Sequence, residues 1–176
     1  MMIIDGKKEA EILRQEIKKE IESLKSKDNK VPGLTVILIG DFAPSQIYVK
    51  NKEKSAKEVG INSNVVRYSK EVKEEEVLKK IEDLNNDIDV SGILVQLPLP
   101  PQINKEKIIN AVSPKKDVDG FHPINVGNLS SGHHALVPCT PLGCLYLIKK
   151  VEKNLSGKHA VIIGRSNLNG KPMAQL

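Results

Sequence analysis

The chain has 176 residues, 39% of them hydrophobic, and only five aromatic residues (three Tyr and two Phe), with a formal net charge of +5. This composition is typical of a globular protein with an Ile, Leu and Val core, and it excludes a disordered chain. Lysines alternate with glutamates, and no basic stripe carries stacking aromatics, so nucleic acid is not an expected partner. No apolar run reaches the length of a membrane span, so we expect a cytoplasmic protein that does not enter membranes.

Helices and strands alternate along the first part of the chain. Apolar residues on one stripe predict a helix over residues 7–25, followed by a loop. The continuously apolar run 34–40 is typical of a strand buried on both faces of a parallel sheet. Further predicted elements are a helix over 44–60, a strand over 64–69, a helix over 73–85, a strand over 90–97 and a helix over 105–112. This order predicts parallel strands joined by right-handed crossovers, with ligands at the carboxyl ends of the strands.

A second unit is expected after an irregular segment that ends at Pro138. The pattern predicts a helix over 141–153, a strand over 158–164, a polar loop, and a helix that begins at residue 171. One strand and an unfinished helix do not make a domain, so we expect a truncated sequence. The chain is therefore divided into residues 1–140 and 141–176.

Lys52 is the candidate catalytic residue of the helix over 44–60. Tyr48, Lys52, Ala56 and Val59 are spaced to lie on one stripe. Desolvation lowers the pKa of an ammonium group, so an inward lysine can shuttle protons near neutral pH. The alternative is that Lys52 lays its stem on apolar surface and its head in water. A Tyr/Lys pair at this spacing also occurs in short-chain dehydrogenases, but there it follows the dinucleotide fold, whereas here it precedes it.

Polar residues also gather at the expected carboxyl edge of the sheet. Gln96 ends an apolar strand, where its amide could reach a neighbouring head group or cap strand-end backbone groups. Asp117, Asp119 and His122 could suggest a metal, but no further ligands stand at suitable spacing, so no metal is expected. A loop carboxylate could instead accept hydrogen bonds from a planar, nitrogen-rich ligand, or Asp117 could cap a turn beside Gly120.

The segment 161–176 has the strand-loop-helix order that can hold phosphates. It matches neither the Walker A pattern nor G-x-G-x-x-G, since Ser166 replaces the second glycine. Arg165 and Ser166 could grip an extra phosphate, such as the 2′-phosphate of NADP. A plain strand-to-helix turn remains the alternative.

Five motifs occur in the order found in one enzyme family. They are SQIYVKNK (45–52), GILVQLPLP (92–100), KDVDGFHPINVG (116–127), PCTPLG (138–143) and GRSNLNGKPMAQL (164–176). With these motifs the chain resembles the bifunctional methylenetetrahydrofolate dehydrogenase/cyclohydrolase family. It departs from the family pattern at Asn169, where valine is more usual, and at Asn128, where a basic residue is usual.

The resemblance implies an α/β fold in which an N-terminal three-layer catalytic domain with a parallel sheet binds folate (1–140). A linker helix and the first strand-loop-helix of an incomplete Rossmann-like NADP domain would follow (141–176). The implied reactions are oxidation of 5,10-methylenetetrahydrofolate with NADP and hydrolysis of the product to 10-formyltetrahydrofolate, by a homodimer acting on tetrahydrofolate derivatives. The truncated chain is expected to bind NADP poorly, to expose apolar surface around residues 145–163 and to lack full activity.

The resemblance also implies roles for individual residues. Lys52 would be the general acid/base, Gln96 would orient it, Tyr48 would stack on the folate, and Asp119 would anchor the pterin. Val95 and Leu97 would complete the substrate contacts, and Gly164, Arg165 and Ser166 would bind NADP, the last two at its 2′-phosphate. Two other functions stay open: a non-catalytic nucleotide- or folate-binding module, and a basic RNA-binding fragment.

Overall fold

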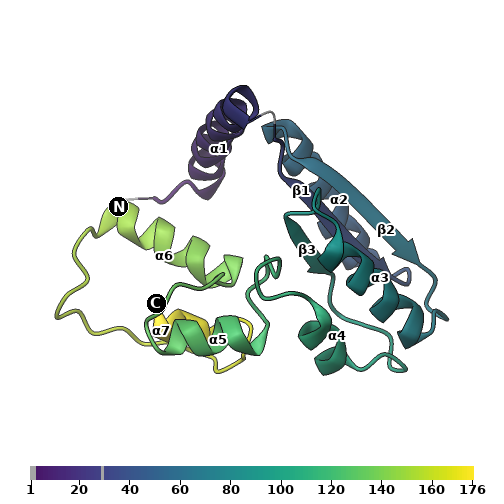
Figure 1. The fold of residues 1–176 in the computed structure, drawn as a ribbon. Helices are drawn as coiled ribbons and strands as arrows, with labels where there is room; N and C mark the ends of the chain where they lie inside the picture. Colours follow the sequence, from purple (N-terminus) through teal and green to yellow (C-terminus); the bar gives the residue numbers. More distant parts are fainter. Residues whose placement is uncertain (1–2, 29) are drawn as a thin grey trace.

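A three-stranded parallel sheet forms the centre of the first part of the chain (Figure 1). The structure, a computed structural model, describes residues 3–28 and 30–176. Strand β1 (Gly33–Ile39) lies between β2 (Asn62–Tyr68) and β3 (Gly92–Val95) and pairs in parallel with both. The predicted parallel pairing is therefore confirmed. Because β1 is central and covered on both faces, nearly all of its residues are buried, as its apolar run predicts.

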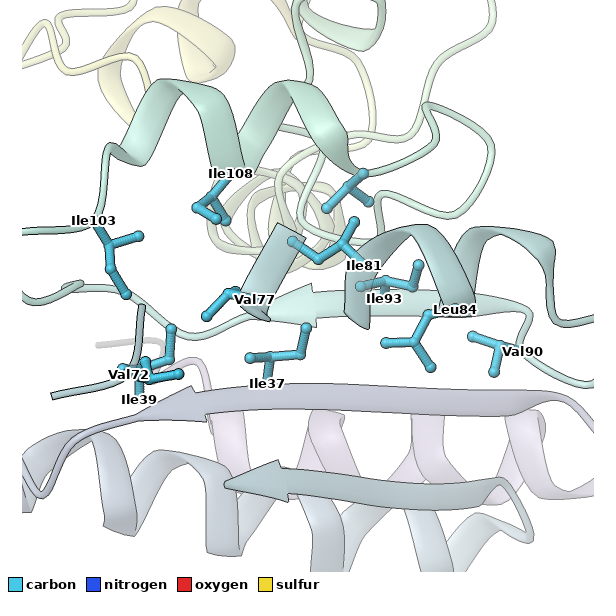
Figure 2. Close-up of a cluster of buried hydrophobic side chains, with 11 residues drawn as sticks. Ile37, Ile39, Val72, Val77, Ile81, Leu84, Val90, Ile93, Ile103 and Ile108 are labelled. Atoms are coloured by element: carbon cyan, nitrogen blue, oxygen red, sulfur yellow. The ribbon is translucent and has the colours of Figure 1, made fainter. Parts of the chain in front are cut away.

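Helices cover both faces of this sheet and make three layers. On one face, α3 (Glu74–Asn86) and α4 (Lys105–Ala111) enclose a cluster that includes Ile37, Ile81 and Ile108 (Figure 2). On the other face, α2 (Ala43–Val59) packs Val49 against Val36, Leu38 and Leu94 of the strands. Helix α1 (Gly6–Asp28) lies against α2. Alternate residues of β1 therefore enter two separate apolar clusters.

The end of α2 and its buried stripe determine the position of Lys52. Gly60 ends the helix in the left-handed conformation, with φ of 94°. The buried stripe consists of Ser45, Val49, Ala56 and Val59, and Lys52 is half-buried along it. The prediction that Tyr48 shares this stripe is wrong, because Val49 occupies the inward position and leaves Tyr48 62% exposed.

One helix lies in the segment that was expected to be irregular. Helix α5 (Pro123–Ser130) begins at a proline, and the His122 Nδ1 accepts a hydrogen bond from the backbone N–H of Ile124 (3.1 Å). Pro at the first helical position is a helix-start signal, and the sequence contains it at Pro123. Histidine is not among the residues preferred at a cap, so the cap itself could not be read from the sequence.

The strand predicted over 158–164 is not formed. After α6 (Cys139–Val151) the chain runs without ladder pairing to α7 (Gly170–Gln175), and Val161 and Ile163 are 78% and 100% exposed. The apolar surface expected around 145–163 is therefore found at residues 161–163, whereas Leu145 is buried. A strand needs neighbours for its backbone groups, and the segment has none here. No helix in the described part of the chain has the length and apolar character needed to cross a membrane.

Shortening a buried side chain of the central strand β1 tests this architecture. We expect Ile37→Ala to lower the free energy of unfolding by about 3 kcal/mol, because it removes buried methyl groups and leaves a cavity under α3. Urea denaturation followed by circular dichroism measures the change. Ile88→Ala is the matched control, since Ile88 is 90% exposed and its loss should change the same free energy by less than about 0.5 kcal/mol. Equal effects of the two variants would contradict the assignment of the core.

Candidate active site

A cleft of about 600 Å³ opens beside the α2 face of the sheet. Lys52 of α2 forms one wall, and Asp119 and Phe121 of the loop between α4 and α5 lie on another. The beginning of α6 contributes Cys139. The remaining lining is largely apolar and comes mainly from the first residues of β1 and β3, including Leu34, Gly92 and Leu94. The cleft thus joins an amine, a carboxylate and a thiol on an apolar background.

Gln96 holds the amine of Lys52 at the end of β3. The Lys52 Nζ donates a hydrogen bond to the Gln96 Oε1 (3.2 Å), and the Gln96 Nε2 donates to the backbone carbonyl of Leu97 (2.8 Å). Because its amide nitrogen is committed to that carbonyl, the Gln96 oxygen is turned toward the amine. The backbone N–H of Gln96 also donates to Ile37 O (2.9 Å), which fixes the residue to the central strand. Sequence reasoning anticipated both the amide contact and the strand-end role.

Asp119 occupies a tight turn opposite Lys52. The Gly120 N–H donates to Asp117 O (3.1 Å), and Gly120 has φ of +66°. A Cβ on Gly120 would lie 2.5 Å from Leu136 O, so the turn needs glycine for two reasons. Burial raises the pKa of Asp119 to about 6; the positive charge of Lys52 opposes this rise and the negative charge of Asp117 adds to it.

Asp117 has a different role from Asp119. Its Oδ2 accepts hydrogen bonds from the His122 N–H (2.8 Å) and from the Asn125 Nδ2 (2.9 Å). It is buried, and these donors occupy it, so the turn-capping interpretation of Asp117 is the one the structure supports. In the part of the chain that the structure describes, no three His, Cys, Asp or Glu side chains are grouped to hold a metal ion.

Cys139 is a cleft residue that the sequence did not reveal as such. Its Sγ approaches Val118 O (3.7 Å), and solvent still reaches part of the side chain. Burial raises the pKa of this thiol, the negative charge of Asp119 raises it further, and Lys52 lowers it. The thiol is therefore kept in its neutral form. Cys139 belongs to the PCTPLG motif (138–143), but a motif does not indicate which of its side chains faces a cleft.

The remaining predicted substrate residues lie outside this cleft lining. Tyr48 is exposed one turn before Lys52. Val95 and Leu97 are half-buried and surround a small void of about 20 Å³ beneath Asp119 and Phe121. Asp119 lines the same void.

The predicted cofactor residues lie in the exposed loop before α7. Gly164, Arg165 and Ser166 are all exposed. The Ser166 Oγ accepts from the N–H groups of Asn169 (3.1 Å) and Gly170 (3.5 Å), which closes the loop on itself. Leu168 lines the Lys52 cleft and also a second cavity of about 670 Å³ between α4, α5 and α7. The loop therefore borders the cleft, although its three predicted residues do not line it.

The raised pKa of Asp119 makes stability depend on pH. Between the ordinary value of 3.8 and about 6, the folded protein holds a proton that the unfolded chain has lost. The contribution of Asp119 to stability therefore falls as pH rises through this interval. We expect Asp119→Asn to match the parent near pH 4 and to be more stable by about 3 kcal/mol at pH 7, since the pKa of Asp119 is about 6 in the folded protein and 3.8 in the unfolded chain.

Urea denaturation from pH 4 to pH 8 measures that difference between variant and parent. Asp41→Asn serves as the control, because Asp41 is exposed and its substitution should leave the difference constant with pH. An Asp119→Asn difference that stays constant, or that shrinks toward pH 7, would contradict the assignment.

Comparison with known proteins agrees with this arrangement. The model of the tetrahydrofolate dehydrogenase/cyclohydrolase catalytic domain matches residues 4–119, and that of the NAD(P)-binding domain of the same family matches residues 138–176. The bifunctional protein FolD of Pelagibacter ubique is 66% identical over all 176 residues, and that of Streptococcus pyogenes (strain Manfredo) is 55% identical over 99% of the chain. The chain spans 63% and 61% of the lengths of these two relatives.

Two solved structures share the fold over nearly the whole chain. The bifunctional FolD enzyme of Campylobacter jejuni superimposes with a TM-score of 0.96 at 48% identity, covering 99% of this chain and 62% of that one. The Trypanosoma brucei FolD enzyme, solved with NADP cofactor and inhibitor, gives 0.94 at 32% identity, with coverages of 99% and 60%. Since the catalytic-domain model alone accounts for more than half of its residues, this chain belongs to the tetrahydrofolate dehydrogenase/cyclohydrolase family.

Proposed function

We propose that the protein to which this chain belongs oxidises 5,10-methylenetetrahydrofolate to the methenyl form with NADP. It then hydrolyses that product to 10-formyltetrahydrofolate, as a reaction of one-carbon metabolism. The observation that carries the proposal is the Lys52–Gln96 hydrogen bond, which directs an amine into a cleft that also holds Asp119. An oriented amine beside a carboxylate of raised pKa is suited to acid–base chemistry on a nitrogen-rich ring.

Lys52 is assigned the proton transfers of the hydrolysis. In its neutral form it removes a proton from water as the water oxygen bonds to the methenyl carbon. It then returns that proton to N5 of the pterin as the carbon–N5 bond breaks. The hydroxyl of the adduct releases its remaining proton to water as it becomes the C=O of the formyl group, which stays on N10. Gln96 accepts a hydrogen bond from the amine throughout and keeps it directed at the reacting carbon.

Asp119 and Tyr48 are assigned to substrate binding. No hydrogen bond engages the Asp119 carboxyl group within residues 3–28 and 30–176, so it can accept N–H groups of the pterin, or donate when protonated below about pH 6. The exposed ring of Tyr48 can stack on the folate one turn before Lys52. Val95 and Leu97 complete this set and line a void together with Asp119.

Gly164, Arg165 and Ser166 are assigned to NADP, which accepts the hydride when bound. Arg165 suits a phosphate, because its guanidinium is exposed and forms no ion pair within the described part of the chain. Residues 1–140 form the folate-binding unit in this proposal, and residues 141–176 begin the NADP-binding unit. A homodimeric state and a cytoplasmic location complete it and rest on the family resemblance.

The reaction is tested by mixing the protein with methylenetetrahydrofolate and NADP and following NADPH formation by absorbance. The assay uses this chain together with any residues that its gene encodes beyond Leu176. Reduction of NADP supports the proposed enzyme. Folate binding without any reduction of NADP would instead favour a non-catalytic binding module, and salt-dependent RNA retention alone would favour an RNA-binding fragment.

Replacing the amine should separate the two activities. We expect Lys52→Met to lower cyclohydrolase activity by about 10²–10⁴-fold, because the proton shuttle is lost, while part of the dehydrogenase activity remains. Loss of methenyltetrahydrofolate absorbance measures the first activity and NADPH formation the second. Lys50→Met, an exposed position on the same helix, controls for general effects of removing a charge. Unchanged cyclohydrolase activity in Lys52→Met would remove Lys52 from the mechanism.

Replacing the proposed phosphate ligand should change cofactor choice. We expect Arg165→Ala to raise the KM for NADP about tenfold, because a charge-assisted contact with the 2′-phosphate is lost. The KM for NAD, which lacks that phosphate, should stay within about twofold in the same variant. Steady-state kinetics with both cofactors provide the comparison. Equal changes for NAD and NADP would place Arg165 away from the 2′-phosphate.

A further inference from the structure

A buried amide on α5 joins three segments around the cleft. The side chain of Asn125 is 5% exposed, and its Nδ2 donates to both Asp117 Oδ2 and Pro114 O, each at 2.9 Å. Its Oδ1 accepts from the N–H of Leu136 at 3.4 Å. One side chain thus links the start of the Asp119 loop to the segment that leads into Cys139 and α6.

These contacts bear directly on the loop that carries Asp119. Asp117 also pairs with Ile93 of β3, so the loop begins on the sheet itself. Gly120 lies so close beneath Leu136 O that a Cβ there would be 2.5 Å away. The loop therefore lies between β3 and the Leu136 segment, and Asn125 bonds to the loop itself at Asp117 and to the Leu136 segment. Little freedom is left for the two residues between Asp117 and Gly120.

We propose that Asn125 is a positioning residue that holds Asp119 at its buried place opposite Lys52. Asn125 does not line the cleft and is assigned no contact with substrate. It acts by keeping the Asp117 turn and the Leu136 segment at a fixed separation. The expected effect of Asn125 on folate binding rests on the proposed function. Its expected effect on the burial of Asp119 does not.

Removing the amide should loosen the turn. In Asn125→Ala, the Asp117 carboxylate loses one buried donor and the Leu136 N–H loses its acceptor, so water must replace them. The Asp119 carboxyl group then becomes better hydrated. Because burial is the largest cause of its raised pKa, that pKa should fall from about 6 toward 3.8, although a longer distance from Lys52 acts in the opposite direction.

The first experiment follows this titration without any ligand. Carbon-13 NMR of the side-chain carboxyl groups gives the pKa of Asp119 in the parent, in Asn125→Ala and in Asn128→Ala. Asn128 is the matched control, because it lies on the same helix and donates to His134 O (3.4 Å) instead of to the Asp117 turn. The proposal expects a lower pKa only in Asn125→Ala. If that variant does not fold, Asn125→Ser, which keeps one donor, is measured in its place. An unchanged Asp119 pKa in the folded variant overturns the proposal.

The second experiment measures tetrahydrofolate binding by calorimetry under anaerobic conditions. We expect Asn125→Ala to weaken binding about tenfold, and we expect the same change to have less than about a twofold effect when Asp119 is already Asn. A purely structural role of Asn125 would weaken binding equally in both backgrounds, and that result overturns the proposal. If the parent does not bind tetrahydrofolate but the Asp119 pKa still falls in Asn125→Ala, the positioning role stands and the proposed function fails.

Discussion

The hydrogen bond between Lys52 and Gln96 is the interaction on which the site depends, and the sheet determines whether it can form. Gln96 follows β3 directly and donates its N–H to Ile37 of the central strand, so its position is set by strand register. The position of Lys52 is set by α2, which packs through Val49 on the face of the sheet opposite to α3 and α4. The two partners therefore meet only if both apolar clusters are correctly packed. This dependence explains why a half-buried amine can be held at one place despite its long, flexible stem.

Two carboxylates in one turn show how the environment separates their roles. The Asp117 carboxylate accepts hydrogen bonds from the His122 N–H and the Asn125 side chain. Asp119 receives no such donors among the described residues, and burial raises its pKa to about 6. The glycine that follows gives the turn its left-handed backbone. The Asp-Val-Asp-Gly order thus yields one carboxylate that is hydrogen-bonded within the turn and one that lines the cleft, from identical side chains.

The sequence predicted the helices and strands that have local signals. It also predicted that Gln96, at the end of β3, would contact a neighbouring head group. The alternation of apolar strands with amphipathic helices gave the parallel sheet, and the polar ending of β3 marked Gln96 as a partner for a head group. The inward stripe of α2 was assigned one residue out of place at Tyr48, because spacing alone does not distinguish it from Val49 beside it. The role of Asn125 was not predictable, since it depends on where the chain returns at Leu136.

The segment 158–164 shows the limit of a local apolar pattern most clearly. Its residues have the composition of a buried strand, yet β-structure requires backbone partners, and the structure places none beside it. The loop that follows is closed by hydrogen bonds within itself, because the Ser166 Oγ accepts from the N–H groups of Asn169 and Gly170. A phosphate would have to compete for those same donors. The Lys52 cleft, by contrast, takes its amine, amide and carboxylate from residues that the three-stranded sheet and the elements packed on it hold in place. The proposed cofactor loop follows a segment that pairs with no strand among the described residues, so its geometry rests on its own hydrogen bonds.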